Sequence, residues 1–442
     1  MSISEEYIKY LRELDKKHYL HPTSSIQQQQ ENGPAFIFAE GKGVHLKDIS
    51  GKTLIDGMSS LWNVNVGHGR EELGQVAMEQ MKKLGYSSSF ATFSHEPAIL
   101  LAAKIAEMTP GDLNAIFYTS GGSESNDTAF KIVRHYWNLK GQPGKKKIIS
   151  RKRGYHGVAM GATSATGIPV FHAMSGGLLP DFLHVDAFST QSLRDMIEAE
   201  GADTIAAFIA EPVQGAGGVH IPKDPQYFQQ VREICDEYNI LFIADEVITG
   251  FGRTGKMFAM EHWGVAPDLM SIAKGITSGY AQLGGVVISE KIHSELINLS
   301  KDTFFHGFTY SGHPVACAVA LRNIEIIESE KLVENSRIMG QEMLKGFQWL
   351  QQEIDIIGEV RGLGLVGAIE IVKDKATGER FESSLSPKIV AEAANRGLIC
   401  RCVTFEGSDT LVFAPPLVIN KEEIDKMIQL LHEAFVATQV KN

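Results

Sequence analysis

The sequence predicts an α/β protein built on a mostly parallel sheet, with a second, smaller domain. Short apolar runs alternate with amphipathic stretches, such as residues 225–238, through the middle of the chain. The runs lie at residues 115–118, 148–149, 206–210, 240–244, 269–273 and 284–288. Strands and helices that alternate in this way form β-α-β units with right-handed crossovers, so we expect most strands to be parallel.

The first residues of the chain predict a short amphipathic helix. The apolar residues that recur there at helical spacing are Tyr7, Tyr10, Leu11 and Leu14. We expect the face that they form to pack on the body of the protein. The segment has no apolar signal core, and no apolar run in the sequence is long enough to cross a bilayer. We therefore expect a cytoplasmic protein without an export or membrane signal.

The pattern of the sequence changes after about residue 325. A long helical stretch reaches Gln351 and leads into the glycine-rich residues 360–367 and then a strand. The last helix begins at Asn420, and Glu423 follows three residues later, as in a capping box. The apolar face of this helix consists of Ile424, Met427, Ile428 and Leu431. These segments predict the smaller domain.

Composition argues against several classes of function. The 442 residues carry 42 Lys and Arg against 53 Asp and Glu, so the chain has no excess of positive charge for binding nucleic acid. Its hydrophobic content of 43% and charged content of 21% are typical of a soluble globular protein. The cysteines are Cys235, Cys317, Cys400 and Cys402. They form no CxxC pair, which favours reduced thiols in a reducing compartment.

Lys274 and Asp245 each directly follow an apolar run. If the two runs are neighbouring parallel strands, the amine and the carboxylate emerge at the same carboxyl edge, where open α/β sheets bind ligands. Pyridoxal phosphate needs a lysine to hold its aldehyde as a Schiff base and an acid to keep its ring nitrogen protonated. Taken singly, either residue is more often a solvated loop residue, so the pair requires support from other motifs.

A possible phosphate site lies at residues 115–126, which are typical of a strand, a Ser/Gly turn and the start of a helix. Free backbone N–H groups at a helix start, together with the helix dipole, suit a phosphate. Gly121 and Gly122 would allow the backbone to approach the phosphate closely. Considered alone, the segment could equally be an ordinary tight turn.

Two glycine motifs are rejected as nucleotide sites. Residues 362–367 match GxGxxG, but a strand rather than a helix follows them, which indicates a structural turn. Residues 250–256 imitate a P-loop, but Met257 stands where a Ser or Thr hydroxyl should hold magnesium. The 15 histidines are scattered rather than set at ligand spacing, so we expect no metal site.

Six ordered motifs give the chain a resemblance to a known family. They are SGGSES at 120–125, GYHG at 154–157, EPVQGAGG at 211–218, ADEVITGFGRTG at 244–255, AKG at 273–275 and GFTYSGHP at 307–314. The chain is similar over nearly its whole length to the class III aminotransferases, which are pyridoxal-phosphate enzymes of the aspartate-aminotransferase fold, fold type I. The resemblance implies a large cofactor-binding domain of residues 60–325 and a small α+β domain of residues 1–59 and 326–442.

Two segments most resemble the ω-transaminase branch of this family. They are SSLWNVNVG at residues 59–67 and HGFTYSGH at residues 306–313. The branch includes amine:pyruvate, β-alanine:pyruvate and taurine:pyruvate enzymes. The resemblance therefore implies a transaminase that moves an amino group from an ω-amino acid or amine to a keto acid such as pyruvate, by a ping-pong mechanism.

The resemblance also implies a set of cofactor-binding residues. Lys274 corresponds to the Schiff-base lysine, and Asp245 to the acid that pairs with the pyridinium nitrogen. Tyr155 and Val247 correspond to the residues on the two faces of the ring. Glu211 belongs to the same cofactor-binding set.

The phosphate site implied by the resemblance involves two subunits. Gly121, Gly122 and Ser123 would bind the phosphate, joined by Thr309 from the second subunit. The active unit would then be a homodimer, whose other partners are a small-molecule amino donor and a keto acid. Thr309 could alternatively be a helix N-cap.

Two residues bear on the choice of substrate. Trp62 would form a wall of the pocket, and Arg401 corresponds to the family arginine that grips a keto-acid carboxylate through a two-pronged contact. The alternative for Arg401 is a solvated loop arginine, because residues 402–409 form a longer segment than the branch usually carries. Ile248 stands where ornithine and GABA aminotransferases usually have glutamine, which argues against those substrates.

Other functions on a similar sequence stay open. The runner-up is the adenosylmethionine-8-amino-7-oxononanoate (diaminopelargonate) aminotransferase of biotin synthesis, whose opening motif resembles Met58-Ser-Ser60. That enzyme usually has a second aromatic residue beside the tryptophan position, where this chain has Leu61 and Asn63. A glutamate-semialdehyde mutase or a dialkylglycine decarboxylase would use the same lysine. A cofactor-sensing regulator would require a DNA-binding segment, which the acidic N-terminus does not offer.

Overall fold

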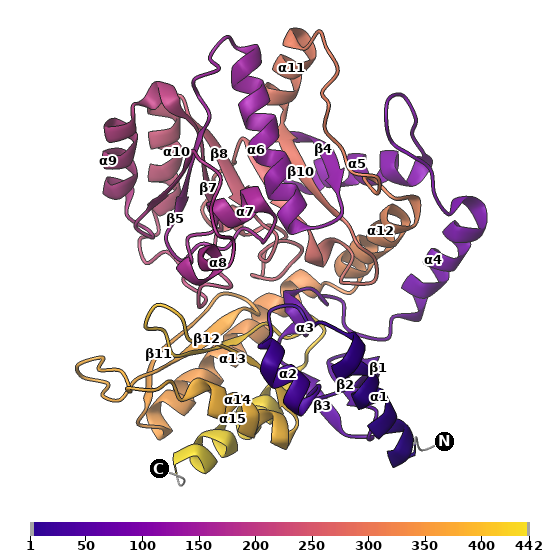
Figure 1. Ribbon diagram of the computed structural model, residues 1–442, viewed down its shortest axis with the longest axis vertical. Helices are drawn as coiled ribbons and strands as arrows, with labels where there is room; N and C mark the ends of the chain where they lie inside the picture. Colours follow the sequence, from indigo (N-terminus) through magenta and orange to yellow (C-terminus); the bar gives the residue numbers. More distant parts are fainter. Residues whose placement is uncertain (1–3, 440–442) are drawn as a thin grey trace.

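The main sheet has seven strands in the order β4-β10-β9-β8-β7-β5-β6 and lies in the upper half of the molecule (Figure 1). Its strands are β4 (Leu113–Thr119), β5 (Lys147–Arg151), β6 (Phe182–Val185), β7 (Ile205–Ala210), β8 (Leu241–Asp245), β9 (Leu269–Ile272) and β10 (Gly284–Ser289). In this computed structural model, which describes residues 4–439, all neighbouring pairs from β6 to β9 are parallel. The predicted α/β class with a mostly parallel sheet is therefore confirmed.

Strand β10 runs antiparallel to both of its neighbours, β4 and β9. The sequence predicted a buried strand at residues 284–288, and Val286 and Val287 are indeed fully buried. The direction of β10 follows from its connection to β9, which consists of a 3-10 turn, η3 (Lys274–Ile276), and a short loop. A parallel neighbour would require a crossover of a dozen or more residues, usually with a helix.

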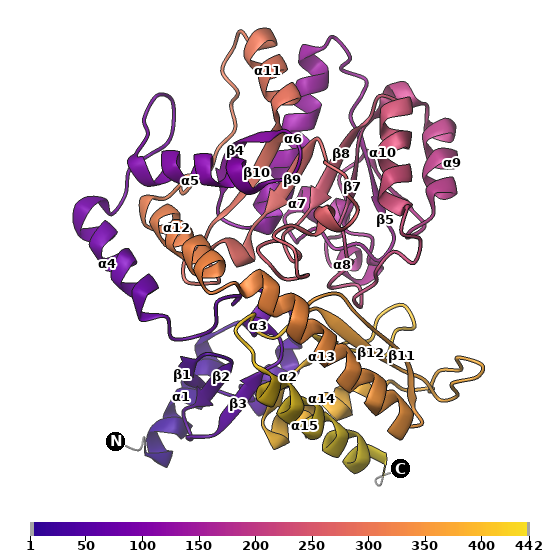
Figure 2. The ribbon, with the colours of Figure 1, turned by 180° about the vertical axis from the view of Figure 1, so that it is seen from behind.

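Helices cover both faces of the main sheet (Figures 1 and 2). Leu241 and Ile243 of β8 pack in a core with α6 (Gly122–Leu139), whereas Phe242 and Ala244 pack in the opposite core with α10 (Tyr227–Glu237). This alternation follows from the two-residue period of a strand. The other helices of this half are α4 (Glu71–Leu84), α5 (Glu96–Met108), α7 (Met160–Ala165), α8 (Pro169–Ala173), α9 (Thr190–Glu200), α11 (Glu290–Leu299) and α12 (Pro314–Ser329), with the 3-10 turns η1 (Ala202–Thr204) and η2 (Ala259–His262).

The other half of the molecule holds two four-stranded sheets, ordered β1-β2-β3-β13 and β11-β12-β15-β14. Their strands are β1 (Phe38–Lys42), β2 (His45–Asp48), β3 (Thr53–Asp56), β11 (Ile357–Gly362), β12 (Gly367–Ile371), β13 (Leu398–Ile399), β14 (Arg401–Val403) and β15 (Thr410–Phe413), and the long helices are α13 (Leu332–Glu353), α14 (Ser386–Arg396) and α15 (Lys421–Gln439). Because β13 pairs in parallel with β3, segments from both ends of the chain build this half (Figures 1 and 2). The domain division at residues 60 and 325 stays a prediction, which this arrangement supports.

Two sequence interpretations in the second half are confirmed. The capping box forms at the start of α15, because Glu423 N donates to Asn420 Oδ1 at 2.9 Å and Asn420 N donates to Glu423 Oε2 at 3.0 Å. The GxGxxG match at residues 362–367 is the turn between β11 and β12, closed by a 2.9 Å bond from Leu363 N to Val366 O. It does not open a helix and is not a dinucleotide fingerprint.

The expectation that the N-terminal helix packs its apolar face on the body of the protein is wrong for a single chain. Helix α1 (Glu5–His18) forms as predicted, but it buries no residue, and Tyr7 and Tyr10 are 49% and 57% exposed. Polar contacts hold the segment instead, because Asp15 accepts hydrogen bonds from His21 and from Gln29 of helix α2 (Ile26–Asn32). The apolar stripe of α1 is thus left free for another surface. Within residues 4–439, no helix combines the length and apolar character required to span a membrane.

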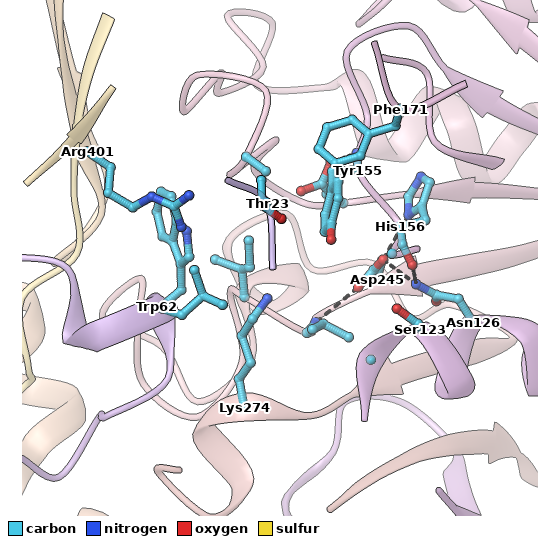
Figure 3. A pocket seen from close by; sticks show the side chains of 17 residues that line it. Thr23, Trp62, Ser123, Asn126, Tyr155, His156, Phe171, Asp245, Lys274 and Arg401 are labelled. Carbon is cyan, nitrogen blue, oxygen red and sulfur yellow. Dashed lines mark hydrogen bonds and ion pairs between the residues drawn. The ribbon is translucent and has the colours of Figure 1, made fainter. Parts of the chain in front are cut away.

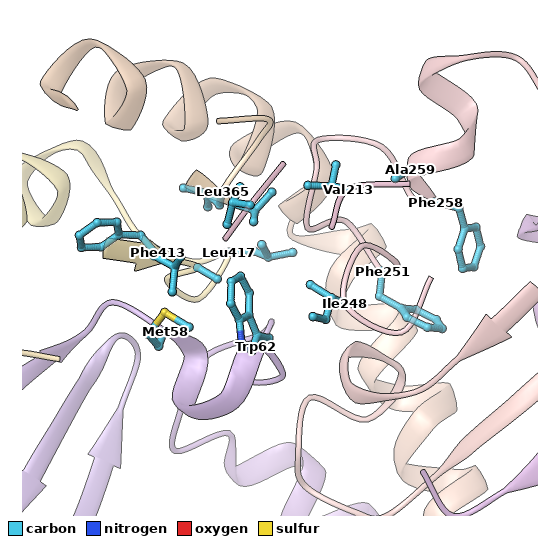
Figure 4. Packing of buried hydrophobic residues seen from close by; sticks show 14 of the residues in the cluster. Met58, Trp62, Val213, Ile248, Phe251, Phe258, Ala259, Leu365, Phe413 and Leu417 are labelled. Atoms are coloured by element: carbon cyan, nitrogen blue, oxygen red, sulfur yellow. The ribbon is translucent and has the colours of Figure 1, made fainter. Parts of the chain in front are cut away.

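The two halves meet in an apolar cluster around Trp62, which ends the short helix α3 (Ser59–Trp62) (Figure 4). The half with both termini supplies Met58, Leu365, Phe413 and Leu417, and the main-sheet half supplies Val213, Ile248 and Phe251. Trp62 is only 5% exposed. A continuous core of this kind holds the two halves in a fixed relation beside the carboxyl edge of the main sheet.

Candidate active site

A cavity of about 260 Å³ lies at the carboxyl edge of the main sheet (Figure 3). The predicted site residues that line it are Trp62, Gly122, Ser123, Tyr155, Glu211, Asp245, Val247, Lys274 and Arg401. Several of them follow β4, β5, β7, β8 and β9, as expected for a ligand site in an open α/β sheet. The lining residues that had not been predicted as site residues are Thr23, Leu61, Asn126, His156, Gly157, Phe171, Ala216 and Ile248.

The expected arrangement of Lys274 and Asp245 is present. Asp245 ends β8 and pairs with Ser271 of the parallel neighbour β9, and Lys274 begins the turn directly after β9. Lys274 has a φ of 50°, in the left-handed region, and its side chain points into the cavity (Figure 3). Burial lowers the pKa of the Lys274 amine to about 8, against the opposing effect of the Asp245 and Glu211 carboxylates.

Three donors fix the orientation of the Asp245 carboxylate, which is 3% exposed. His156 Nδ1 and Asn126 Nδ2 each lie 2.8 Å from Oδ2, and Val247 N donates to Oδ1 at 3.1 Å. Asn126 comes from α6, while His156 comes from the segment after β5. The carboxylate is therefore held from several elements at once and cannot turn freely within the site.

The start of α6 lies at the cavity with no side chain that caps it. Gly121 is the N-cap of this helix of 18 residues, and no side chain caps its first N–H groups. A Cβ on Gly122 would lie 2.7 Å from Val247 Cγ1, and one on Gly157 would lie 2.3 Å from Ser123 Oγ. Glycine is thus required at both positions by the close approach of these segments. The free N–H groups and the helix dipole favour a phosphate at this point.

Glu211 supports the segment that carries Tyr155. Its Oε1 accepts a hydrogen bond from Tyr155 N at 2.8 Å, and its Oε2 accepts one from Gly215 N at 3.0 Å. Burial raises the pKa of Glu211 to about 7, although the nearby His156 opposes this. Burial likewise raises the pKa of the Tyr155 phenol, whose ring contacts that of Phe171 with centroids 5.4 Å apart.

Arg401 and Trp62 lie together at one end of the cavity, Asp245 lies at the other, and the Lys274 amine lies between them (Figure 3). Trp62 has a φ of 63°, and such left-handed backbone costs a non-glycine residue about 1–3 kcal/mol. The buried contacts around Trp62 offset this cost. Within residues 4–439, no hydrogen bond or ion pair engages the Arg401 guanidinium, which is exposed at the edge of the cavity.

Thr309 does not line the cavity of its own chain. It lies in the loop between α11 and α12, is exposed, and accepts a 2.8 Å hydrogen bond from the Tyr86 hydroxyl at its carbonyl. The role of Thr309 in the site of a second subunit therefore stays a prediction.

Some lining residues carried a weak sequence signal and others carried none. Asn126 lies one helical turn after Gly122, so it faces the same side of α6, and His156 directly follows Tyr155. Thr23 reaches the cavity from the loop between α1 and α2, and Phe171 reaches it from α8. Only the tertiary structure brings Thr23 and Phe171 to the site.

Comparison with known proteins identifies the family. The model of the family "Aminotransferase class-III" matches residues 26–435. The chain belongs to the class III aminotransferases. This aminotransferase is 43% identical to a putrescine–pyruvate aminotransferase of Pseudomonas aeruginosa, over 96% of the chain and 95% of the relative. It is 38% identical to the mitochondrial gamma aminobutyrate transaminase 1 of Solanum lycopersicum, over 95% of the chain and 85% of the relative.

Solved structures show the same fold. A transaminase from the marine bacterium Virgibacillus is 56% identical to this aminotransferase with a TM-score of 0.96, covering 98% of this chain and 99% of that one. An (S)-enantioselective omega-transaminase from Thermomicrobium roseum is 46% identical with a TM-score of 0.94, covering 97% and 98%. The omega transaminase from Pseudomonas jessenii in complex with PMP is 37% identical with a TM-score of 0.93, covering 98% of each chain.

These matches confirm three predictions made from the sequence: membership of class III, fold type I, and aminotransferase activity. The similar structures include ω-transaminases, the branch that residues 59–67 and 306–313 indicated. The diaminopelargonate alternative is not favoured by these relatives.

Proposed function

We propose that this aminotransferase moves an amino group from a primary amine or an ω-amino acid to a keto acid such as pyruvate, by a ping-pong mechanism with pyridoxal phosphate. The observation that carries the proposal is the order of groups along the cavity. A half-buried amine, Lys274, lies between an oriented carboxylate, Asp245, and the Arg401 guanidinium, which has no partner in the described residues. One end thus suits a cationic ring, and the other suits a substrate carboxylate.

The residues present fit pyridoxal phosphate. The uncapped start of α6 would take the phosphate, with N–H groups near Gly121, Gly122 and Ser123. Asp245 would hold the ring nitrogen, and Asn126 has a buried Oδ1 without a partner beside the same carboxylate. When bound, pyridoxal phosphate supplies an aldehyde that can carry the amino group and a ring that withdraws electrons.

Side chains on both faces of the ring would hold it, with Glu211 and Asp245 nearby. Tyr155 and Val247 line the cavity from the segments after β5 and β8, which supports their assignment to the two faces. Glu211 holds the backbone of Tyr155 through its 2.8 Å bond and thereby positions that face. Removing Asp245 would take from His156 Nδ1 its carboxylate partner and from Asn126 Nδ2 one of its two acceptors, so the site has little tolerance for its loss.

Lys274 is the group that would move the proton. Its pKa near 8 means that the amine gains and loses a proton close to neutral pH, whereas an ordinary lysine would stay charged. An amine placed beside the reacting carbon can take the proton and return it to a neighbouring atom. A positioned group of this kind typically contributes about 10²–10⁴-fold to the rate.

Arg401 and Trp62 would select the substrates. The guanidinium has no competing partner in the described chain, so it is available to a keto-acid carboxylate. Trp62, Leu61 and Ile248 give the cavity apolar walls suited to the hydrocarbon part of an amine. In a ping-pong reaction the two substrates use this one cavity in turn.

We also infer that the active unit is a homodimer in which Thr309 reaches the phosphate site of the partner subunit. One chain exposes an aromatic surface around the loop of Thr309, with Phe93 67%, Phe305 94% and Tyr310 60% exposed. The apolar stripe of α1 is exposed as well. Surfaces of this kind are typical of subunit interfaces. A second copy of the chain would cover them.

The free thiols agree with a cytoplasmic location, which we propose together with this function. Cys235, Cys317, Cys400 and Cys402 are all unpaired, and the first three are buried. Burial raises the pKa of the Cys235 and Cys317 thiols to about 12, so these two are unreactive structural groups.

A panel of amino donors with pyruvate, read by alanine formation, tests the proposed function. We expect alanine to form in proportion to the donor consumed for at least one amine or ω-amino acid. Lys274→Ala should transaminate no donor and should lack the absorbance of a covalently held cofactor. A mutase or a dialkylglycine decarboxylase would not convert pyruvate to alanine stoichiometrically with an amine donor. Activity with S-adenosylmethionine as the only accepted donor would indicate the diaminopelargonate reaction.

A further inference from the structure

Arg401 depends on its backbone for its position at the cavity. Its side chain has no hydrogen-bond or ion-pair partner in the described residues, so only the strand that carries it places the guanidinium. That strand, β14, pairs with β15 in a hairpin, where Arg401 lies opposite Val412 and Val403 lies opposite Thr410. The hairpin closes through residues 404–409, which lie within the segment 402–409 that is longer than the branch usually carries.

Two anchors hold the closing loop of this hairpin. Asp409 fastens it to its own half, because its carboxylate accepts hydrogen bonds from Leu385 N at 2.8 Å and Ser386 N at 3.0 Å, at the start of α14. Arg153 fastens it to the opposite half. The Arg153 guanidinium donates to Ser408 Oγ and to the Glu406 carbonyl, both at 3.0 Å.

Backbone contacts fix the position of the Arg153 main chain. Its backbone has a φ of 61°, and its N–H donates to the Gly167 carbonyl at 2.7 Å. A Cβ on Gly217 would lie 2.2 Å from the Arg153 carbonyl oxygen, so a third segment packs tightly on this turn. Arg153 lies two residues before Tyr155, which lines the cavity. The contact therefore joins the cofactor segment to the loop of the Arg401 hairpin.

We propose that Arg153 is a positioning residue for the carboxylate specificity of the enzyme. Its two hydrogen bonds hold residues 404–409 against the main-sheet half, and this keeps β14 where Arg401 reaches the end of the cavity. Ser408 is only 6% exposed, so its bond to Arg153 is shielded from water. The inference rests on the proposed function, since it assumes that Arg401 receives the carboxylate of the keto acid.

The test compares two amino acceptors with one amine donor in the holoenzyme: pyruvate, which has a carboxylate, and butanal, which has none. In Arg153→Met, which keeps an apolar stem but no donor, we expect KM for pyruvate to rise about tenfold, with kcat within about twofold. KM for butanal should stay within about twofold. Lys152→Met is the matched control, because in the described residues the exposed Lys152 side chain pairs with Asp186 and does not contact residues 404–409, so it should change neither KM.

A second variant distinguishes an effect of the loop position from an effect of the Arg153 charge. Ser408→Ala removes one acceptor but leaves the Arg153 charge in place, and we expect it to raise KM for pyruvate by about threefold. Normal pyruvate kinetics in Ser408→Ala, with a raised KM in Arg153→Met, would assign the effect to charge and overturn the proposal. So would an equal change in KM for both acceptors.

Hydrogen exchange supplies a readout that does not depend on turnover. Amides of residues 404–409 should exchange faster in Arg153→Met than in the parent enzyme, and Lys152→Met should leave them unchanged. Arg401→Ala distinguishes the two levels of inference. If Arg401→Ala does not discriminate pyruvate from butanal, the proposed role of Arg401 fails. If it does and Arg153→Met does not, the positioning role alone fails.

Discussion

The Lys274 amine must lose its proton to react, and its desolvated environment favours that neutral state. Burial favours the neutral amine and lowers its pKa to about 8, while the carboxylates of Asp245 and Glu211 act in the opposite direction. The result is an amine that is partly neutral near physiological pH. That state is the one in which a lysine can attack an aldehyde or accept a proton.

The first prediction concerns the titration of Lys274 in the cofactor-free protein. Because only the neutral amine is acylated, the rate of labelling of Lys274 should rise with pH and level off above a midpoint near 8. An ordinary lysine would continue to gain reactivity up to about pH 10.4. Competitive labelling with an acylating reagent, quantified by mass spectrometry of the Lys274 peptide, measures this midpoint.

Asp245→Asn serves as the matched variant for this titration. The Asp245 charge raises the pKa of Lys274, so its removal should move the labelling midpoint to lower pH. A midpoint that stays unchanged, or that rises, would contradict the assigned coupling between the two side chains.

For single residues, the sequence predicted those side chains of the cavity whose position follows from the ends of parallel strands. Asp245 and Lys274 end or follow parallel strands, so the carboxyl-edge rule alone brings them together, and the family resemblance extends the set to Tyr155 and Arg401. Thr23 could not be predicted in this way, because its loop reaches the cavity only through the packing of other segments.

At the scale of elements, local pattern identified the strands but not all of their directions or partners. β10 was recognised by its apolar run, yet its antiparallel direction depends on the short connection through η3. Helix α1 was recognised by its period, yet the surface that covers its apolar face is absent from the single chain. Periodicity reports which face is apolar and does not identify what that face contacts.

The loop after β8, whose residues 250–256 imitate a P-loop, has a structural role that depends on Arg253. Arg253 is fully buried and donates to the Leu365 and Pro415 carbonyls, to Ser59 Oγ at 2.9 Å and to Asn65 Oδ1 at 2.8 Å. Burial lowers the pKa of Arg253 to about 9, against the opposing charge of Asp56. The loop therefore joins segments of both halves through one guanidinium and does not cradle a nucleotide.

The second prediction tests this element. Arg253→Met would leave four buried acceptors without their donor, and each unsatisfied group costs about 1–3 kcal/mol. We expect the free energy of unfolding of the cofactor-free protein to fall by about 3 kcal/mol or more, measured by urea denaturation. Lys256→Met, an exposed change in the same loop, is the control and should lie within about 0.5 kcal/mol of the parent. A loss below about 1 kcal/mol in Arg253→Met would show that the bonds contribute little.

At the scale of the whole molecule, two features of the single chain bear on the proposed homodimer. Thr309 does not line the cavity of its own chain, and the surface exposes the aromatic residues around the Thr309 loop. Both features have one explanation if two copies associate through this surface and exchange the loop. Neither could be predicted from strand and helix patterns, because an interface between copies leaves no period in the sequence of one chain.

The last prediction tests whether Thr309 acts across subunits, by combining an impaired chain with an inactive chain in one dimer. Thr309→Ala should lose about tenfold or more in activity at limiting pyridoxal phosphate, because a hydrogen bond to a charged group is removed, and Lys274→Ala should be inactive. In a heterodimer of the two variants, one site would combine Lys274 from one chain with Thr309 from the other. Differently tagged chains, purified as the mixed dimer, should therefore recover about half of the parent activity. If Thr309 acted within its own chain, neither site of the mixed dimer would be intact, and the activity would be about half that of the Thr309→Ala protein.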